Sequence, residues 1–230
     1  MQTLLDRDTN LLFSPPEAGC VLYLPGLPGS GSKVYDRSPY GNIGTIYGAT
    51  WKKLPSGLWC LSFDNVDDYI NCGTNASLTS AKGTIALWAK RNASGQYTAL
   101  VHLIEDASQD YLELKIAGDN KAKIEIEDGN ASKVSIATSN TITDTNWHHL
   151  AYTQEGSGVK IYVDGEEQST SGTNSSYWSS HLSLTGSKIG TNIFGSINGY
   201  IALPRIYNRP WSALDVQNSF NREKHLFGVW

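Results

Sequence analysis

The sequence of 230 residues is poor in the features that mark several classes of protein. It contains no unbroken run of about 18 apolar residues, the length that a membrane-spanning helix requires. Its 18 basic residues are fewer than its 22 acidic ones, so a basic patch for nucleic acid is not expected. The first residues lack the basic start and continuous apolar segment of a signal peptide. The sequence therefore predicts no membrane insertion, no nucleic-acid partner and no export signal.

Cysteine is also scarce, and Cys20, Cys60 and Cys72 do not have the paired spacing of a zinc site. If residues 60–63 and 69–72 pair as a hairpin, Cys60 and Cys72 face each other and a disulfide is geometrically possible. Two buried thiols are the favoured alternative, because free cysteine is among the most buried residue types. A chain of this length can bury a large core without disulfides.

Helical periodicity is nearly absent, whereas short runs rich in Val, Ile, Tyr and Trp recur between Gly, Asn, Asp and Ser turns. This pattern is typical of a β-sandwich. One helix is expected over about 212–221, because Ser212 and Asp215 have the spacing of a reciprocal N-terminal cap. Strands are expected near residues 20–24, 45–50, 57–63, 69–72, 83–90, 97–104, 111–116, 121–127, 132–138, 147–154, 159–163, 181–190 and 196–208.

No break in composition marks a second domain, so residues 20–221 are expected to form one domain between two terminal segments. Residues 1–19 contain several large apolar side chains and are interpreted either as a docking arm or as a loose tail. Residues 222–230 end in HLFGVW, which is too apolar to be left in water, so we expect this segment to dock on the domain or on a partner. Residues 169–180 are interpreted as a polar loop.

The stretch NWHHLAYTQEGSGVKIYVDGEE, residues 146–167, invites a metal-site interpretation because His148 and His149 are adjacent. Neighbours on a strand point to opposite faces, so the two imidazoles cannot chelate one ion. Asp164 and Gly165 supply a tight turn between strands. We therefore interpret the stretch as a β-hairpin with structural histidines.

Segments in a fixed order carry a family resemblance. They are LSFDNVDDYINCG (61–73), GTIALWAK (83–90), NWHHLAYT (146–153), GVKIYVDGE (158–166) and GYIALPRIYNRPWSALDV (199–216). Together they resemble the laminin G-like domains of the concanavalin A-like lectin/glucanase superfamily. The earlier DRSPYGNIGTIYGATW (36–51) is similar to a segment that opens many bacterial and phage members. The resemblance covers roughly residues 20–220 and implies an all-β, two-sheet antiparallel jelly-roll sandwich with one short C-terminal helix.

The resemblance also raises a calcium site, which some members build from the early Asp-x-Ser segment and a late acidic residue. Here the late segment reads Ile201-Ala202-Leu203 where related domains often have Ile-Asp-Glu, which counts against the site. Calcium takes about six to eight oxygen ligands. The candidate ligands are Asp36, Asp64, Asp67 and Asp68. No other cofactor is expected.

Glucanases of this superfamily carry a Glu-x-Asp-x-Glu motif along one strand. The nearest segment is KIEIEDGN, in which Glu125 and Glu127 share one face but no aspartate lies between them. Paired carboxylates are what glycoside hydrolysis needs, yet this run fits an outward strand face over a buried one. We therefore predict no catalytic residue.

Sugar binding instead needs exposed aromatic rings beside hydrogen-bonding groups, because sugar faces are partly apolar. The candidate ligand-binding residues are Tyr97, Tyr111, Asn174, Tyr177 and Trp178.

Three functional classes stay open. The resemblance implies action outside cells, whereas the chain starts at Met1 without an export signal. A non-enzymatic virion structural or surface module, such as a phage capsid decoration, fibre or tail component, reconciles these two features. Its partners would be other virion subunits or copies of itself, through residues 1–20 and 222–230, and host or environmental glycans. The alternatives are a bacterial surface carbohydrate-binding or adhesion module and a glycoside hydrolase.

Overall fold

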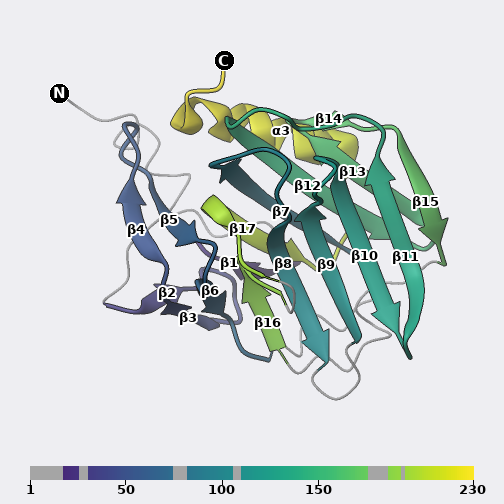
Figure 1. Cartoon of the computed structure of the whole chain (residues 1–230), viewed down its shortest axis with the longest axis horizontal. Coiled ribbons are helices and arrows are strands. Elements are labelled where there is room, and N and C mark those ends of the chain that lie inside the picture. The colour runs from purple at the N-terminus through teal and green to yellow at the C-terminus, as the bar shows by residue number, and fades with distance from the viewer. Residues whose placement is uncertain (1–17, 26–30, 75–81, 106–109, 176–185, 193–194) are drawn as a thin grey trace.

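The computed structural model describes residues 18–25, 31–74, 82–105, 110–175, 186–192 and 195–230, and the remaining residues lie outside the described part of the chain. Within it the strands form two antiparallel sheets (Figure 1). The predicted two-sheet sandwich with one short C-terminal helix is therefore confirmed. In this part of the chain no helix has the length and apolarity needed to cross a lipid bilayer.

The eight-stranded sheet has the order β14-β13-β12-β7-β17-β5-β4, and β1 pairs with β17 beside this path. Its strands are β1 (Cys20–Tyr23), β4 (Thr50–Lys53), β5 (Trp59–Asp64), β7 (Lys82–Arg91), β12 (Trp147–Glu155), β13 (Gly158–Val163), β14 (Glu166–Glu167) and β17 (Asn198–Tyr207).

The nine-stranded sheet has the order β15-β11-β10-β9-β8-β16-β6-β3-β2. Its strands are β2 (Lys33–Tyr35), β3 (Ile43–Tyr47), β6 (Tyr69–Asn71), β8 (Thr98–Glu105), β9 (Asp110–Ile116), β10 (Ala122–Asp128), β11 (Ala131–Thr138), β15 (Thr170–Asn174) and β16 (Gly186–Ile189). In Figure 1 the strands from β8 to β11 run side by side.

The main hydrophobic core lies between the two sheets, because alternate side chains of each strand point toward the other sheet. Leu87 and Leu150 contribute from the eight-stranded sheet, and Leu112 and Ile124 contribute from the nine-stranded sheet. This arrangement leaves the other face of each sheet to be covered or to meet solvent.

Helix α3 (Ala213–Glu223) and the short 3₁₀ helix η3 (Lys224–Phe227) follow the last strand. The Ser212 hydroxyl accepts the Asp215 N–H, and the Asp215 carboxylate accepts the Ser212 N–H, so the predicted reciprocal cap is confirmed. The two helices pack on the outer face of the eight-stranded sheet, where Trp88 stacks on Phe227 with ring centroids 4.2 Å apart. The predicted segment 222–230 therefore docks on the domain in part, through Leu226 and Phe227.

Two of the sequence-based assignments, one of a strand and one of a loop, are wrong. Instead of one strand over 45–50, the chain forms β3 in one sheet and β4 in the other. Gly48 lies between them at φ 68°, where a Cβ would overlap the Asp68 carboxylate. Within the predicted polar loop 169–180, residues 170–174 form the edge strand β15. The start of the expected strand 181–190 lies outside the described residues.

The hairpin considered as a possibility between residues 60–63 and 69–72 does not form, because β5 and β6 belong to different sheets. Cys60 and Cys72 are both buried and free, which confirms the favoured alternative of two thiols. Cys20 is buried and free as well.

Candidate functional site

The outer face of the nine-stranded sheet carries a continuous line of polar side chains, one from each strand. Successive members are register partners on neighbouring strands. We name this set the polar row. From β2 to β15 it comprises Lys33, Thr45, Asn71, Lys188, His102, Glu113, Glu125, Ser135 and Thr173.

Strand alternation explains why the row lies outside the core. In β9, Glu113 alternates with the buried Leu112 and Leu114, and in β10, Glu125 alternates with the buried Ile124 and Ile126. Neighbouring strands lie about 4.8 Å apart, so a row across nine strands extends roughly 38 Å. The row is therefore long enough to contact an extended ligand at several points.

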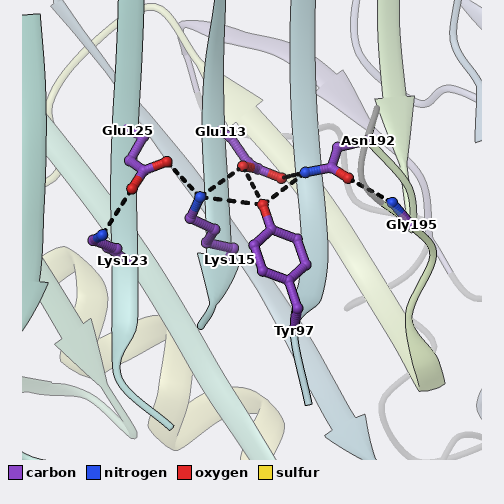
Figure 2. A network of polar contacts seen from close by, with 7 residues as sticks. All are labelled: Tyr97, Glu113, Lys115, Lys123, Glu125, Asn192 and Gly195. Carbon is purple, nitrogen blue, oxygen red and sulfur yellow. Dashed lines mark hydrogen bonds and ion pairs between the residues drawn. The ribbon is translucent and has the colours of Figure 1, made fainter. Parts of the chain in front are cut away.

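The centre of the row is a hydrogen-bonded network around Glu113, whose side chain is fully buried (Figure 2). The Tyr97 hydroxyl donates to the Glu113 carboxylate at 2.6 Å, and the Lys115 ammonium donates to it at 3.1 Å. The Asn192 amide donates to both the Glu113 carboxylate and the Tyr97 hydroxyl oxygen. Three neighbours therefore fix this carboxylate in place.

Lys115 links Glu113 to the next member of the row. Its ammonium group donates to Glu125 as well as to Glu113, and it lies 4.9 Å from the Tyr97 ring centroid. The other Glu125 oxygen pairs with Lys123 at 2.8 Å. Two carboxylates therefore share one ammonium group that lies between them.

Burial raises the pKa of Glu113, and its hydrogen bonds from Lys115, Tyr97 and Asn192 oppose this shift without cancelling it. Burial also acts to raise the pKa of Glu125, but the hydrogen bonds from Lys115 and Lys123 outweigh it, so the net shift is downward. The different surroundings of the two carboxylates explain the opposite directions.

His102 lies between Lys188 and Glu113 in the row and is 1% exposed. Its ring packs on Tyr111 with centroids 5.2 Å apart, and neither ring nitrogen has a hydrogen-bond partner among the described residues. Burial, together with the charges of Lys188 and Lys115, lowers its pKa to about 4. His102 is therefore neutral at pH 7, and the accessible parts of the row lie on either side of the buried pair His102 and Glu113.

The predicted ligand-binding residues do not form one group in the structure. The Tyr97 hydroxyl is held by Glu113, and Tyr111 is 5% exposed in β9, so the prediction of an exposed Tyr111 ring is wrong. Asn174 ends the edge strand β15, where its amide donates to the Ser157 carbonyl. Tyr177 and Trp178 lie outside the described residues. The binding role of all five stays a prediction.

Sequence reasoning missed the members of the network that come from β9 and from the segment after β16. Glu113 and Lys115 alternate with leucines in the segment YLELKI, and this alternation is a signal that could have marked a polar outer face. Asn192 has no comparable local signal, because only the fold brings it to Glu113.

Of the predicted calcium ligands, the structure brings Asp64, Asp67 and Asp68 together. One carboxylate oxygen of each lies within 4.8 Å of the others. Asp36 is not part of this group. Its carboxylate accepts five hydrogen bonds from Tyr23, Ser38 and Asn42 and so organises the turn between β2 and β3.

Each of the three carboxylates places one oxygen near the others, and three such oxygens are fewer than the six to eight ligands that calcium usually takes. Asp68 also already accepts the Asp64 N–H at 2.8 Å. The calcium site therefore stays a prediction, and Asp36 does not fit it because its lone pairs are already engaged.

The two adjacent histidines lie on opposite faces of β12, as predicted. The His148 ring nitrogens contact Asp164 at 2.8 Å and Asp144 at 2.9 Å. The His149 ring is fully buried beneath α3, next to Arg205. The two rings therefore have separate structural surroundings and cannot form one metal site.

Comparison with known proteins gives a family and a set of structural neighbours. The family model described as concanavalin A-like lectin/glucanases superfamily matches residues 64–217. No curated protein sequence matches the chain.

The solved structures include the Trypanosoma rangeli sialidase in complex with sialic acid, with a TM-score of 0.68 and 15% identity over 92% of this chain. The binding domain of botulinum neurotoxin DC, in complex with rat synaptotagmin II, has a TM-score of 0.70 and 15% identity over 88% of this chain. This chain spans 34% of the first and 51% of the second.

Domain 4 of the extracellular arabinanase AbnA from Geobacillus stearothermophilus, in complex with arabinotriose, has a TM-score of 0.70 and 19% identity. The match covers 88% of this chain and 98% of that domain. At such identities these likenesses show the fold alone.

Proposed function

Because this chain belongs to the concanavalin A-like lectin/glucanases superfamily, we propose that it is a non-enzymatic carbohydrate-binding module that holds an oligosaccharide along the polar row. The observation that carries this proposal is the register itself. Nine strands each place one polar side chain on the same line of the outer face. A chain of sugar hydroxyls needs such a series of donors and acceptors.

Two structural neighbours support a glycan as the ligand. The arabinanase domain was solved in complex with arabinotriose, and that domain is almost the same size as this chain. Cell entry of botulinum neurotoxin type C depends on interaction with two ganglioside molecules. The matching part of the neurotoxin, which is 51% of that chain at a TM-score of 0.69 and 15% identity, and the arabinanase domain share the fold of this chain, so the fold is compatible with glycan binding.

The shared ammonium group argues against a hydrolase. A retaining glycoside hydrolase needs one carboxylate free to attack and a second carboxyl group free to donate a proton to the leaving group. Here Lys115 contacts both Glu113 and Glu125 and lies between them. The proposed module therefore binds sugars without cleaving them.

A glycan array probed with the purified chain tests this proposal. We expect wild-type protein to bind a group of oligosaccharides, and Glu125→Gln combined with Ser135→Ala to reduce that binding, because both residues belong to the accessible part of the row. The matched control is Glu155→Gln on the eight-stranded sheet, which also removes the carboxylate of a Glu–Lys pair with a 2.8 Å contact. Binding of no glycan, or equal binding by all three proteins, would contradict the proposal.

Residence on a virus particle is a separate hypothesis, with a bacterial cell surface as its alternative. Either place fits a glycan-binding domain of this family. Antibody labelling of purified source particles, viewed by negative-stain electron microscopy, decides between them. Particles without label would exclude the virion role and leave the carbohydrate-binding proposal intact.

A further inference from the structure

The strands at the ends of the two sheets differ in charge. On the eight-stranded sheet β14 is Glu166–Glu167 and β4 ends with Lys52 and Lys53, and on the nine-stranded sheet β2 begins with Lys33. Charged side chains on an edge strand oppose its pairing with another chain. Residues 168–175, which contain the fourth end strand β15, carry no charged side chain. Of these four ends, β15 is therefore the one that charge does not protect.

The backbone of β15 is paired on one side. It pairs with β11 without a register shift, and among the described strands none pairs with its other side (Figure 1). The Ser175 N–H donates to the Lys133 carbonyl at 2.8 Å, which establishes which residues of this ladder face β11. In an antiparallel ladder, successive residues direct their backbone groups to opposite sides. The N–H and C=O groups of Thr170 and Gly172 therefore point away from β11.

Gly172 leaves the middle of this edge unshielded. It is exposed, and because it has no side chain, the exposed atoms belong to its backbone. A Cβ at this position would overlap the Ser135 carbonyl oxygen, and φ is 138°, so pairing with β11 excludes a larger residue. Ser171 and Thr173 on either side are small and exposed. Within β15, no bulky side chain covers the central backbone donors and acceptors.

A second copy of this chain fits this edge. Antiparallel pairing around a two-fold axis places the same segment on both sides, so the groups of Thr170 and Gly172 in one copy meet those of the other. Each copy has a net charge of −4, and a contact through a charge-free segment places no like charges against each other within the paired strands. The far end of the sheet, β2, is three residues long and begins with Lys33, so the assembly closes as a dimer.

We propose that two copies pair through β15 to form a dimer in which the two nine-stranded sheets become one continuous sheet. A two-fold axis perpendicular to the sheet keeps both outer faces on the same side. Thr173 is the last member of the polar row, so the row of the second copy begins where the first row ends. The dimer does not depend on the carbohydrate-binding function, but it presents two rows on one surface.

Sedimentation velocity of the purified chain over a wide range of concentrations tests the dimer. We expect a monomer–dimer equilibrium without larger species. Ser171 shares the outer face with Thr173, so Ser171→Lys and Ser171→Glu each bring like charges together near the axis. Each variant should weaken the dimer by about fivefold, the upper end of the effect of like charges on adjacent strands. An equimolar mixture of the two variants should regain the wild-type affinity.

The matched control is Thr50→Lys, which places the same charge at an exposed position of the end strand β4 and should leave the dimer unchanged. Hydrogen–deuterium exchange then locates the contact. The peptide that contains residues 169–174 should exchange more slowly as the protein concentration rises, whereas the peptide that contains residues 50–53 should not.

The outcomes are distinguishable from failure of the proposed function. A chain that stays monomeric at every concentration overturns the dimer, and this result is also the one expected if β15 pairs with a strand of a different protein. A dimer that the Ser171 variants do not weaken, or one without slower exchange in residues 169–174, has its interface elsewhere and also overturns the proposal. A chain that dimerises through β15 but binds no glycan overturns the carbohydrate-binding function alone.

Discussion

The outer faces of the two sheets differ in character: one is aromatic and covered by helices, and the other carries polar side chains. On the eight-stranded sheet the outward positions include Trp88, Trp147 and Tyr162, and α3 with η3 covers them. On the nine-stranded sheet the corresponding positions form the polar row. The same strand alternation thus produces one face that must be covered and one that can meet a ligand.

The buried charges of the two faces are satisfied in different ways. Arg205 on β17 makes a bidentate ion pair with Glu223 of α3 at 2.6 and 2.8 Å, and the Trp88 indole N–H also donates to Glu223. That network joins a sheet to the layer that covers it. Glu113 and Lys115 instead are neighbours within one sheet. The Arg205–Glu223 ion pair thus holds α3 on the eight-stranded sheet, whereas the Glu113–Lys115 ion pair orders side chains on the outer face of the nine-stranded sheet.

The largest effect is expected from Glu223→Ala. It leaves the fully buried Arg205 without its counterion, which costs about 3–5 kcal/mol of unfolding free energy. Urea unfolding at pH 7 measures the loss, and dye binding to the uncovered aromatic face should rise. The control Glu155→Ala removes an exposed partner of Lys82 and should cost less than about 1 kcal/mol. Equal costs for the two variants would show that α3 does not depend on this pair.

A smaller loss is expected from Lys115→Met on the open face. The buried Glu113 keeps Tyr97 and Asn192 but loses its cation, which costs about 2 kcal/mol. The control Lys160→Met breaks an exposed pair with Glu167 that has a 2.8 Å contact. A Lys115→Met variant as stable as this control in urea unfolding would mean that the network does not stabilise the sheet.

A pH-dependent change, which per pH unit is smaller than either loss above, compares one histidine from each face. Burial lowers the pKa of both His102 and His149 to about 4, while the unfolded chain titrates near 6.5. Between these values the unfolded state binds more protons, so stability falls as the pH falls from 6.5 to 4, by at most about 1.4 kcal/mol per pH unit for each histidine.

His102→Leu removes one of these two contributions and loses no hydrogen bond to the described part of the chain, where neither ring nitrogen has a partner. Chemical unfolding at several pH values should therefore show a shallower decline for the variant than for wild type. Identical slopes would mean that His102 is protonated in the folded state at these pH values.

The two-sheet sandwich could be predicted from the sequence because alternating apolar residues and turn residues are local signals. The reciprocal cap at Ser212 and the opposed histidines of β12 follow from spacing alone. The hairpin joining Cys60 and Cys72 failed because spacing cannot show that the chain crosses between sheets after β5. The edge strand β15 was missed because Ser, Gly and Thr give it the composition of a loop.

The candidate site was harder to predict than the fold because its residues meet only through pairing of distant strands. Lys188 lies next to His102 and Asn71 because β16 inserts between β8 and β6. Aromatic residues chosen for their chemistry, such as Tyr111, are buried by neighbours that the sequence does not identify.

The position of β16 has a consequence for the order in which the protein acquires its binding face. Residues 33–71 and 98–174 contain the strands of the two parts of the nine-stranded sheet, and in the described chain β16 at residues 186–189 joins these parts. A ribosome releases the chain from its N-terminus, so both parts leave the exit tunnel before the strand that joins them. The continuous row therefore does not exist during most of synthesis, and a chain that ends before β16 lacks the complete surface that we propose for binding.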